Sequence, residues 1–80
     1  MAEKHENYLF DLGLIFKERA LEARRQRDAL PLESSERAFQ SGRVIAFNEV
    51  ISIMMQQAEG FGIPLSDLQL EDIEPDRDLT

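Results

Sequence analysis

The residues best able to do chemistry in this 80-residue sequence are its carboxylates and its single histidine. Helical bundles can hold metal ions between facing helices, but that site requires Glu-x-x-His motifs. The only histidine is His5, and the sequence contains no Glu-x-x-His. Glu49 is the one acidic residue inside the most apolar segment, and we interpret it as part of a narrow polar strip with Asn48, Ser52 and Gln56. We therefore expect neither a metal nor a cofactor.

Nucleophilic catalysis has equally little support in the sequence. There is no cysteine, and one histidine near the N-terminus gives no visible catalytic triad. Ser41-Gly42-Arg43 could contact a phosphate, but it lies inside a predicted helix and lacks a glycine-rich loop. We expect a structural role for these three residues and no enzymatic activity. An enzyme with a site in the core of a helical bundle is kept as a further alternative.

A basic strip and an acidic tail are the remaining charged features. The strip carries a net charge of +3 over residues 17–27 and consists of Lys17, Arg19, Arg24, Arg25 and Arg27. Residues 59–80 hold one arginine against seven acidic residues, among them Asp76 and Asp78. The possible contacts for a partner are the five basic residues of the strip together with Asp76 and Asp78. The alternative is that the strip pairs with the protein's own tail, whose charge is complementary.

Composition sets further limits on the protein. A chain of 80 residues is one domain with a marginal core, and without cysteine no disulfide can reinforce it. A net charge of −7 and a pI near 4.5 argue against general binding to nucleic acid. No run of about 18 apolar residues predicts a membrane span, and the acidic N-terminus does not resemble a secretory signal. We expect a cytoplasmic protein.

Hydrophobic spacing predicts an all-α fold. Apolar residues at helical intervals predict a first helix over about 6–29, which Pro31 ends, and a second helix over about 35–59 with Ser34 or Ser35 as its N-cap. Ser66 and Gln69 have the spacing of a capping box, so we expect a short third helix over about 67–73. Residues 74–80 should fray. The short connection between the two long helices predicts an antiparallel helical hairpin.

The second helix is apolar on more of its circumference than the first helix can cover. We therefore expect two hairpins to pair into a dimeric four-helix bundle. The predicted dimer interface consists of Phe39, Val44, Phe47, Val50, Ile51, Met54 and Met55. Two alternatives remain open. The tail could fold back over the second helix in a monomer, using Leu65, Leu68, Leu70 and Ile73, or a different protein could cover that helix.

These features predict a small, non-enzymatic interaction or regulatory protein, an adaptor or modulator acting as a homodimer. Its bundle would be the scaffold, and the basic strip and acidic tail would contact a protein partner. The alternative from another functional class is a small nucleic-acid-associated regulator that uses the basic strip of the first helix.

Overall fold

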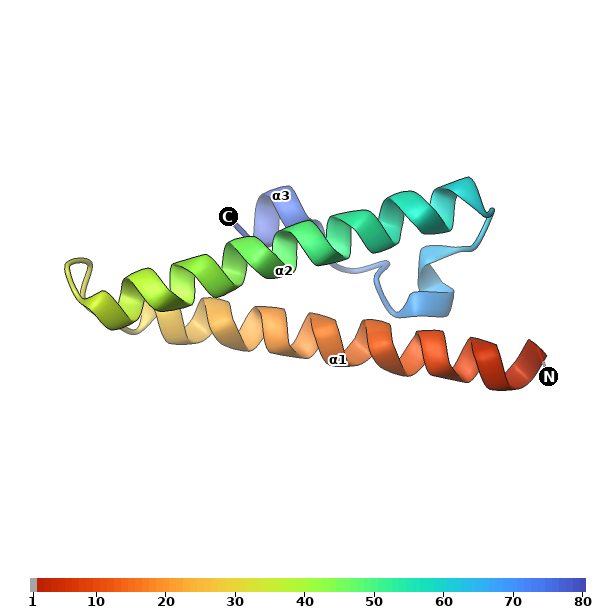
Figure 1. The fold of residues 1–80 in the computed structure, drawn as a ribbon, viewed down its shortest axis with the longest axis horizontal. Helices are drawn as coiled ribbons and strands as arrows, with labels where there is room; N and C mark the ends of the chain where they lie inside the picture. The colour runs from red at the N-terminus through yellow and green to blue at the C-terminus, as the bar shows by residue number, and fades with distance from the viewer. Residues whose placement is uncertain (1) are drawn as a thin grey trace.

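A computed structural model describes the backbone from residue 2 to residue 80 and the side chains from residue 3 onward. Helix α1 spans Ala2–Asp28 and helix α2 spans Ser35–Gly60. A 3-10 turn, η1, spans Leu65–Leu68, and a single helical turn, α3, spans Pro75–Asp78. The two long helices lie side by side and antiparallel (Figure 1). The structure thus confirms the predicted all-α helical hairpin.

Helix α1 begins at Ala2, earlier than residue 6, where the sequence places the start of the first helix. Glu3 lies in its first turn, and Arg25 and Arg27 lie in its last turn. Acidic residues near the N-terminus and basic residues near the C-terminus both favour the helix dipole. The favourable charge of Glu3 in the first turn is therefore enough to account for the earlier start of α1.

The connection between the long helices is stabilised by two side chains. The Ser34 hydroxyl accepts a hydrogen bond from the Arg37 backbone N–H at 3.0 Å, so Ser34 is the N-cap of α2. The Arg37 guanidinium donates to the carbonyls of Arg27 and Leu30, at 2.9 and 3.0 Å. The Arg27 carbonyl lies in the last turn of α1, where helix acceptors lack intrahelical partners, and the Leu30 carbonyl lies in the connection just after it. One arginine of α2 thereby closes the C-terminus of α1.

Helix α2 ends in a Schellman motif. The Ile63 N–H donates to the Ala58 carbonyl at 2.8 Å, and the Gly62 N–H donates to the Glu59 carbonyl at 3.1 Å. Gly62 has a φ of 68°, a conformation that glycine adopts without steric cost. After α2 the chain turns back, and η1 lies against α1 (Figure 1).

The third helix expected over 67–73 does not form. The short 3-10 turn η1 ends at Gln69, which has a φ of 56°, in the left-handed region. Residues 68 and 70 of a continuous helix would point about 200° apart, so only one of them could reach the core. The left-handed residue between them allows both Leu68 and Leu70 to be buried. Burial of two leucines outweighs the local capping signal.

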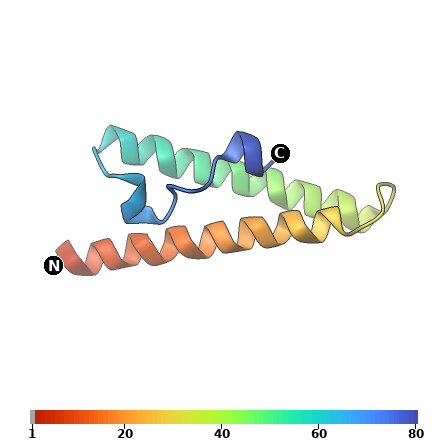
Figure 2. The same cartoon turned by 180° about the vertical axis from the view of Figure 1, so that it is seen from behind.

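The expectation that residues 74–80 fray is wrong. This segment forms α3 and packs against the hairpin, with Pro75 and Leu79 buried. The tail, defined here as residues 63–80, lies along one side of the hairpin, as the rear view shows (Figure 2). The other side of the hairpin carries no tail segment. This arrangement matches the alternative in which the tail folds back over the second helix.

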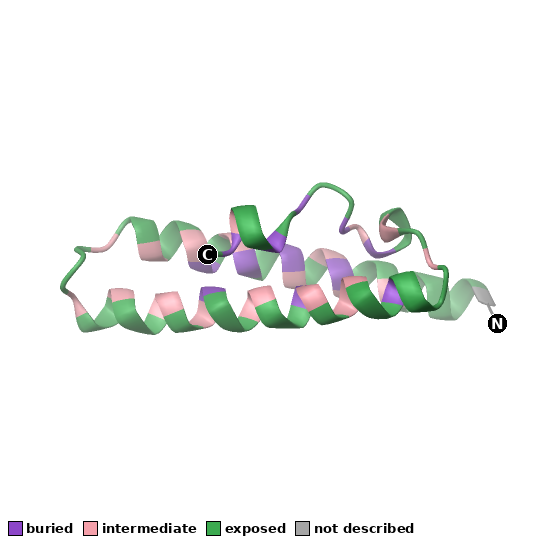
Figure 3. Ribbon diagram, turned by 90° about the horizontal axis from the view of Figure 1, so that it is seen from above, coloured by how far each residue is buried: buried purple, intermediate pink, exposed green. Residues whose placement is uncertain are grey.

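The core lies between the two long helices and the tail (Figure 3). Ala20 and Ala23 of α1 are fully buried, as are Val44 and Ile51 of α2. Small residues on α1 permit a close approach of the two helices, and the tail adds Leu68, Leu70, Ile73 and Leu79 to the same cluster. The result is an elongated molecule of 48 × 20 × 16 Å.

Candidate functional site

The basic strip of α1 contacts the tail. Lys17 is only 9% exposed, and its ammonium lies 2.9 Å from the Asp72 carboxylate. Arg24 donates to the Asp78 carbonyl at 3.3 Å, and Arg27 donates to the Thr80 carbonyl at 2.8 Å. Three of the five predicted basic contacts therefore hold the protein's own tail. This pairing is the alternative that charge complementarity suggested from the sequence.

The other charged residues of the predicted partner contacts have different surroundings. Arg25 pairs with Glu22 of its own helix at 2.6 Å, and Arg19 is exposed. Asp78 lies 3.9 Å from Arg24, whereas Asp76 is exposed. Arg19 and Asp76 thus have solvent-facing side chains, and Arg19 lines the same open hollow as Arg25.

Asn48 is a tail-binding residue whose role the sequence analysis missed. Its side-chain amide donates to the carbonyls of Pro75 and Leu79, at 3.0 and 3.1 Å. Ser52 donates to the Asn48 side-chain oxygen at 3.2 Å, which orients the amide. The sequence signal was present, because two hydrogen-bonding residues four apart interrupt the apolar segment. That spacing does not reveal whether water or a chain segment occupies the polar strip.

Ion pairs and hydrogen bonds lower the pKa of two acidic residues in the tail. The hydrogen bond from Lys17 lowers the pKa of Asp72 below its usual value. Hydrogen bonds from Arg77 and from the Glu74 backbone N–H lower the pKa of Asp78 further, and the charges of Arg77 and Arg24 act in the same direction. Both carboxylates are therefore stabilised in the ionised form. In that form Asp72 holds the tail to Lys17 of α1, whereas Asp78 is bound mainly by Arg77 and Glu74 of the tail itself.

Acidification is expected to loosen the tail. A carboxylate with a lowered pKa in the folded state stabilises the fold above its unfolded pKa of about 3.9, and this contribution is lost as the pH falls below that value. The urea midpoint should therefore decrease from pH 6 to pH 3. In Asp72→Asn the decrease should be smaller, because one of the titrating groups is gone. Parallel pH profiles for the two proteins would contradict a role for the Lys17–Asp72 pair.

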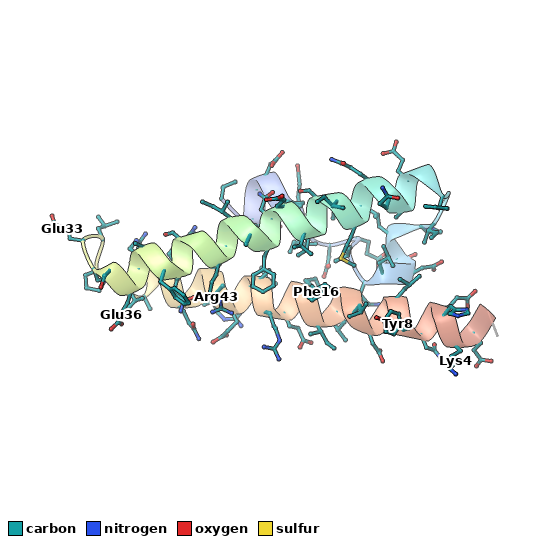
Figure 4. All side chains as sticks on the ribbon, viewed as in Figure 1. Lys4, Tyr8, Phe16, Glu33, Glu36 and Arg43 are labelled. Carbon is teal, nitrogen blue, oxygen red and sulfur yellow. The ribbon has the colours of Figure 1, made fainter. Side chains whose placement is uncertain are left out.

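The side of the hairpin opposite the tail is rich in apolar residues. Figure 4 labels Tyr8, Phe16 and Arg43 on this tail-free side. The Arg43 guanidinium lies 5.9 Å from the centre of the Phe47 ring, a distance typical of cation–π contact. The large exposed apolar residues of the two long helices are Tyr8, Phe10, Ile15, Phe39, Ile45, Val50 and Ile53, and Phe61 follows α2 directly. Among them, Ile45 lies on the tail side, where it lines a hollow with Leu79 and Thr80.

The residues predicted for the dimer interface fall into three groups. Val44 and Ile51 are fully buried within the single chain, so they have no free surface for a second copy. Phe47, Met54 and Met55 are half-buried against the core. Phe39 and Val50 are exposed, together with Ala46 and Ile53, which the predicted interface omits. The accessible part of the predicted interface is thus the part that faces away from the tail.

A hollow of about 300 Å³ lies near the C-terminal end of α2. Apolar side chains from α1, α2 and the tail line most of it, and its lining consists of Leu9, Ile53, Met54, Gln57, Ala58, Phe61, Ile63 and Leu68. No charged group lines it. The hollow extends the apolar surface and offers space for the side chain of another molecule.

The residues considered for catalysis stand apart from one another. His5 lies near the start of α1, whereas Glu49 and Ser41 lie on α2, and Glu49 is exposed. Arg43 donates to the Gln40 side chain at 2.9 Å. Within the described residues, no three or more acidic or histidine side chains come close enough together to hold a metal ion. Over the same residues, no helix has the length and hydropathy of a membrane span.

No family model matches the sequence, and comparison of the chain with curated proteins and with solved structures found no match.

Proposed function

We propose that this chain is a small, non-enzymatic helical protein that acts through protein–protein contact as a homodimer. In this dimer, two hairpins pair into a four-helix bundle and leave their tails on the outside. The observation that carries the proposal is the set of exposed apolar residues on α2, which includes Phe39 at 66% exposure and Ile53 at 50% exposure. Exposed apolar surface of this extent on a small chain marks an interaction site.

The arrangement of the tail supports this proposal. The tail packs over one side of the hairpin and leaves the other side of α2 uncovered. The same contacts weaken the case for a nucleic-acid regulator, because Lys17, Arg24 and Arg27 already bind tail groups. Binding to phosphates requires free cationic groups. The apolar side of α2 is therefore a stronger candidate for the working surface than the basic strip.

Sedimentation equilibrium over a dilution series tests the proposal. The wild-type chain should sediment as a dimer at micromolar concentrations. Val50→Asp should remain helical but sediment as a monomer, with a dissociation constant raised roughly 100-fold, because the interface would bury a charge without a partner. Val50 is 40% exposed, so a new carboxylate can reach water in the monomer.

Gln56→Asp is the matched control for this experiment. Gln56 is exposed on α2 and lies off the face that carries Phe39 and Val50. This variant adds the same charge to the same helix and should keep the wild-type dissociation constant. A wild-type chain that sediments as a folded monomer at every concentration would contradict the proposal.

A further inference from the structure

One face of α2 has a regular and symmetric spacing of residues. Seven positions follow one another at intervals of 4, 3, 4, 4, 3 and 4 residues, which places them on one side of a helix. We call this the outer face, and its members are Ser35, Phe39, Gly42, Ala46, Val50, Ile53 and Gln57. All seven residues are exposed. The packing of the chain itself therefore leaves most of the outer face open to solvent.

The residue types on the outer face are arranged symmetrically about Ala46. Phe39 and Ile53 each lie seven residues from Ala46, and both are large and apolar. Ser35 and Gln57 each lie eleven residues away, and both are polar. An isologous contact brings one surface patch against its own copy, so each residue meets the one that lies equally far on the other side of the two-fold axis. With the axis at Ala46, these large apolar residues meet each other and these polar residues meet each other.

We propose that the outer face of α2 packs antiparallel against the outer face of a second copy, with the two-fold axis at Ala46. This inference rests on the proposed homodimer and specifies its contact surface. In this register Phe39 of each copy meets the partner's Ile53, and Gly42 meets the partner's Val50. The small side chain of Ala46 lies where the two helices are closest, and the polar residues lie at the two ends.

Gly42 provides a second, independent observation. A glycine in the interior of a helix weakens the helix relative to alanine, so its presence calls for a structural reason. A Cβ atom added at Gly42 would meet no atom of this chain within 4 Å. The fold of the single chain therefore does not require a glycine here. A second helix that packs closely around Ala46 would require a glycine at position 42, because the partner's Val50 would occupy that space.

The exposed apolar area is of the size that a dimer needs. Phe39 is 66% exposed and Phe61, one step beyond the outer face, is 77% exposed. A phenylalanine presents about 150–250 Å², so these two rings alone offer on the order of 300 Å². Val50, Ile53 and Leu32 add further exposed apolar surface. Together these five side chains offer on the order of 600 Å², and a stable interface typically buries roughly 800 Å² per partner, so the smaller and polar residues of the outer face would supply the remainder. The antiparallel register also brings Phe61 near the partner's Leu32.

Cysteine cross-linking tests the register, because the chain has no cysteine of its own. A disulfide requires Cα atoms within about 7 Å, so a single cysteine links two copies only near the two-fold axis. Under mild oxidation, Ala46→Cys should form a covalent dimer at least ten times faster than Ile45→Cys. Ile45 is 63% exposed and directly precedes Ala46 in the chain, but it points about 100° away from Ala46. It is therefore the matched control.

Two further variants separate antiparallel from parallel pairing. In the antiparallel register, Phe39→Cys alone should stay monomeric on a non-reducing gel, whereas Phe39→Cys/Ile53→Cys should cross-link. Rapid linking of Phe39→Cys alone would overturn the inference in favour of a parallel pair. If the wild-type chain sediments as a dimer but Ala46→Cys and Ile45→Cys cross-link at equal rates, this register is wrong. The proposed homodimer would then remain supported. A monomeric wild-type chain would overturn both.

Discussion

Ile51→Asp is expected to unfold the chain at 25 °C, whereas Val50→Asp, one residue earlier, should remain folded. Ile51 is 0% exposed and is the largest fully buried side chain, while Val50 is 40% exposed. The two substitutions add the same charge to the same helix. A difference in stability between the two variants would therefore reflect the difference in burial of the two positions. Circular dichroism at 222 nm during urea titration measures the stability of each variant.

The size of the Ile51 effect follows from three quantities. Removing most of a buried isoleucine side chain costs about 2–5 kcal/mol, and burying a carboxylate without a partner costs several kcal/mol more. A chain of this length is stable by roughly 4–12 kcal/mol at 0.05–0.15 kcal/mol per residue. The two losses together are comparable with the whole stability. A wild-type urea midpoint for Ile51→Asp would contradict the packing of α2 against α1 and the tail.

This expectation also decides which residue can test self-association. Ile51 belongs to the residues predicted for the dimer interface, but in the structure it is buried within its own chain. Loss of a dimer in Ile51→Asp would therefore reflect unfolding. Val50 is the residue whose substitution separates association from folding.

Gly13→Ala is expected to displace the tail from α1. Gly13 is buried beneath η1, and a Cβ atom added there would overlap the Leu68 carbonyl oxygen and lie 2.8 Å from its carbon. The atoms in conflict are backbone atoms, which cannot rotate away as the end of a side chain can. Overpacking of this kind costs about 1–3 kcal/mol or more. Alanine recovers only about 1 kcal/mol of helix propensity, so the net effect is destabilising.

Displacement of the tail has a measurable consequence besides lower stability. Loss of the η1 contact should free Leu68 and Leu70, and the segment after Gly62 should become sensitive to proteases. Limited proteolysis followed by mass spectrometry would detect cleavage within residues 63–80, while the two long helices remain intact. Equal protection of the tail in Gly13→Ala and in the wild-type chain would contradict the close approach of η1 to α1.

Gly60→Ala is the matched control for Gly13→Ala. Gly60 is the last residue of α2, and a Cβ atom added there meets nothing within 4 Å. The same methyl group should therefore leave the urea midpoint unchanged or raise it slightly. A lower urea midpoint for Gly13→Ala, beside an unchanged or higher midpoint for Gly60→Ala, would show that Gly13 is needed for packing against the tail and that Gly60 is not.

Local signals in the sequence determined the two long helices and their connection. Helical spacing of apolar residues places the helices, and Ser34 caps α2 as its residue type predicts. Gly62 followed by Pro64 stops α2, because glycine adopts the positive φ of the Schellman motif. Each of these features depends on residues within one or two turns of one another. Their physics is therefore contained in short stretches of sequence.

Only the tertiary structure decided the conformation of the tail. The local capping signal over 66–69 favours a helix, yet Gln69 adopts the left-handed conformation because burial of two leucines is worth more than a helical turn. Likewise, Pro75 and the hydrogen bond from the Glu74 N–H to Asp78 favour only a single helical turn. Its position on the hairpin depends on Asn48, which lies 27 and 31 residues away from its two partners. Contacts over such separations cannot be read from short stretches of sequence.

For the surface of α2, too, the sequence determined one property and the tertiary structure determined another. The sequence determined that α2 is apolar on more than one side, and so that something besides α1 must cover it. The tertiary structure decided which side the protein covers itself: the tail buries Val44 and Ile51 together with α1, and the face with Phe39, Ala46 and Ile53 stays exposed. The reason is geometric, because a helix presents its sides to different neighbours and the path of the tail selects among them.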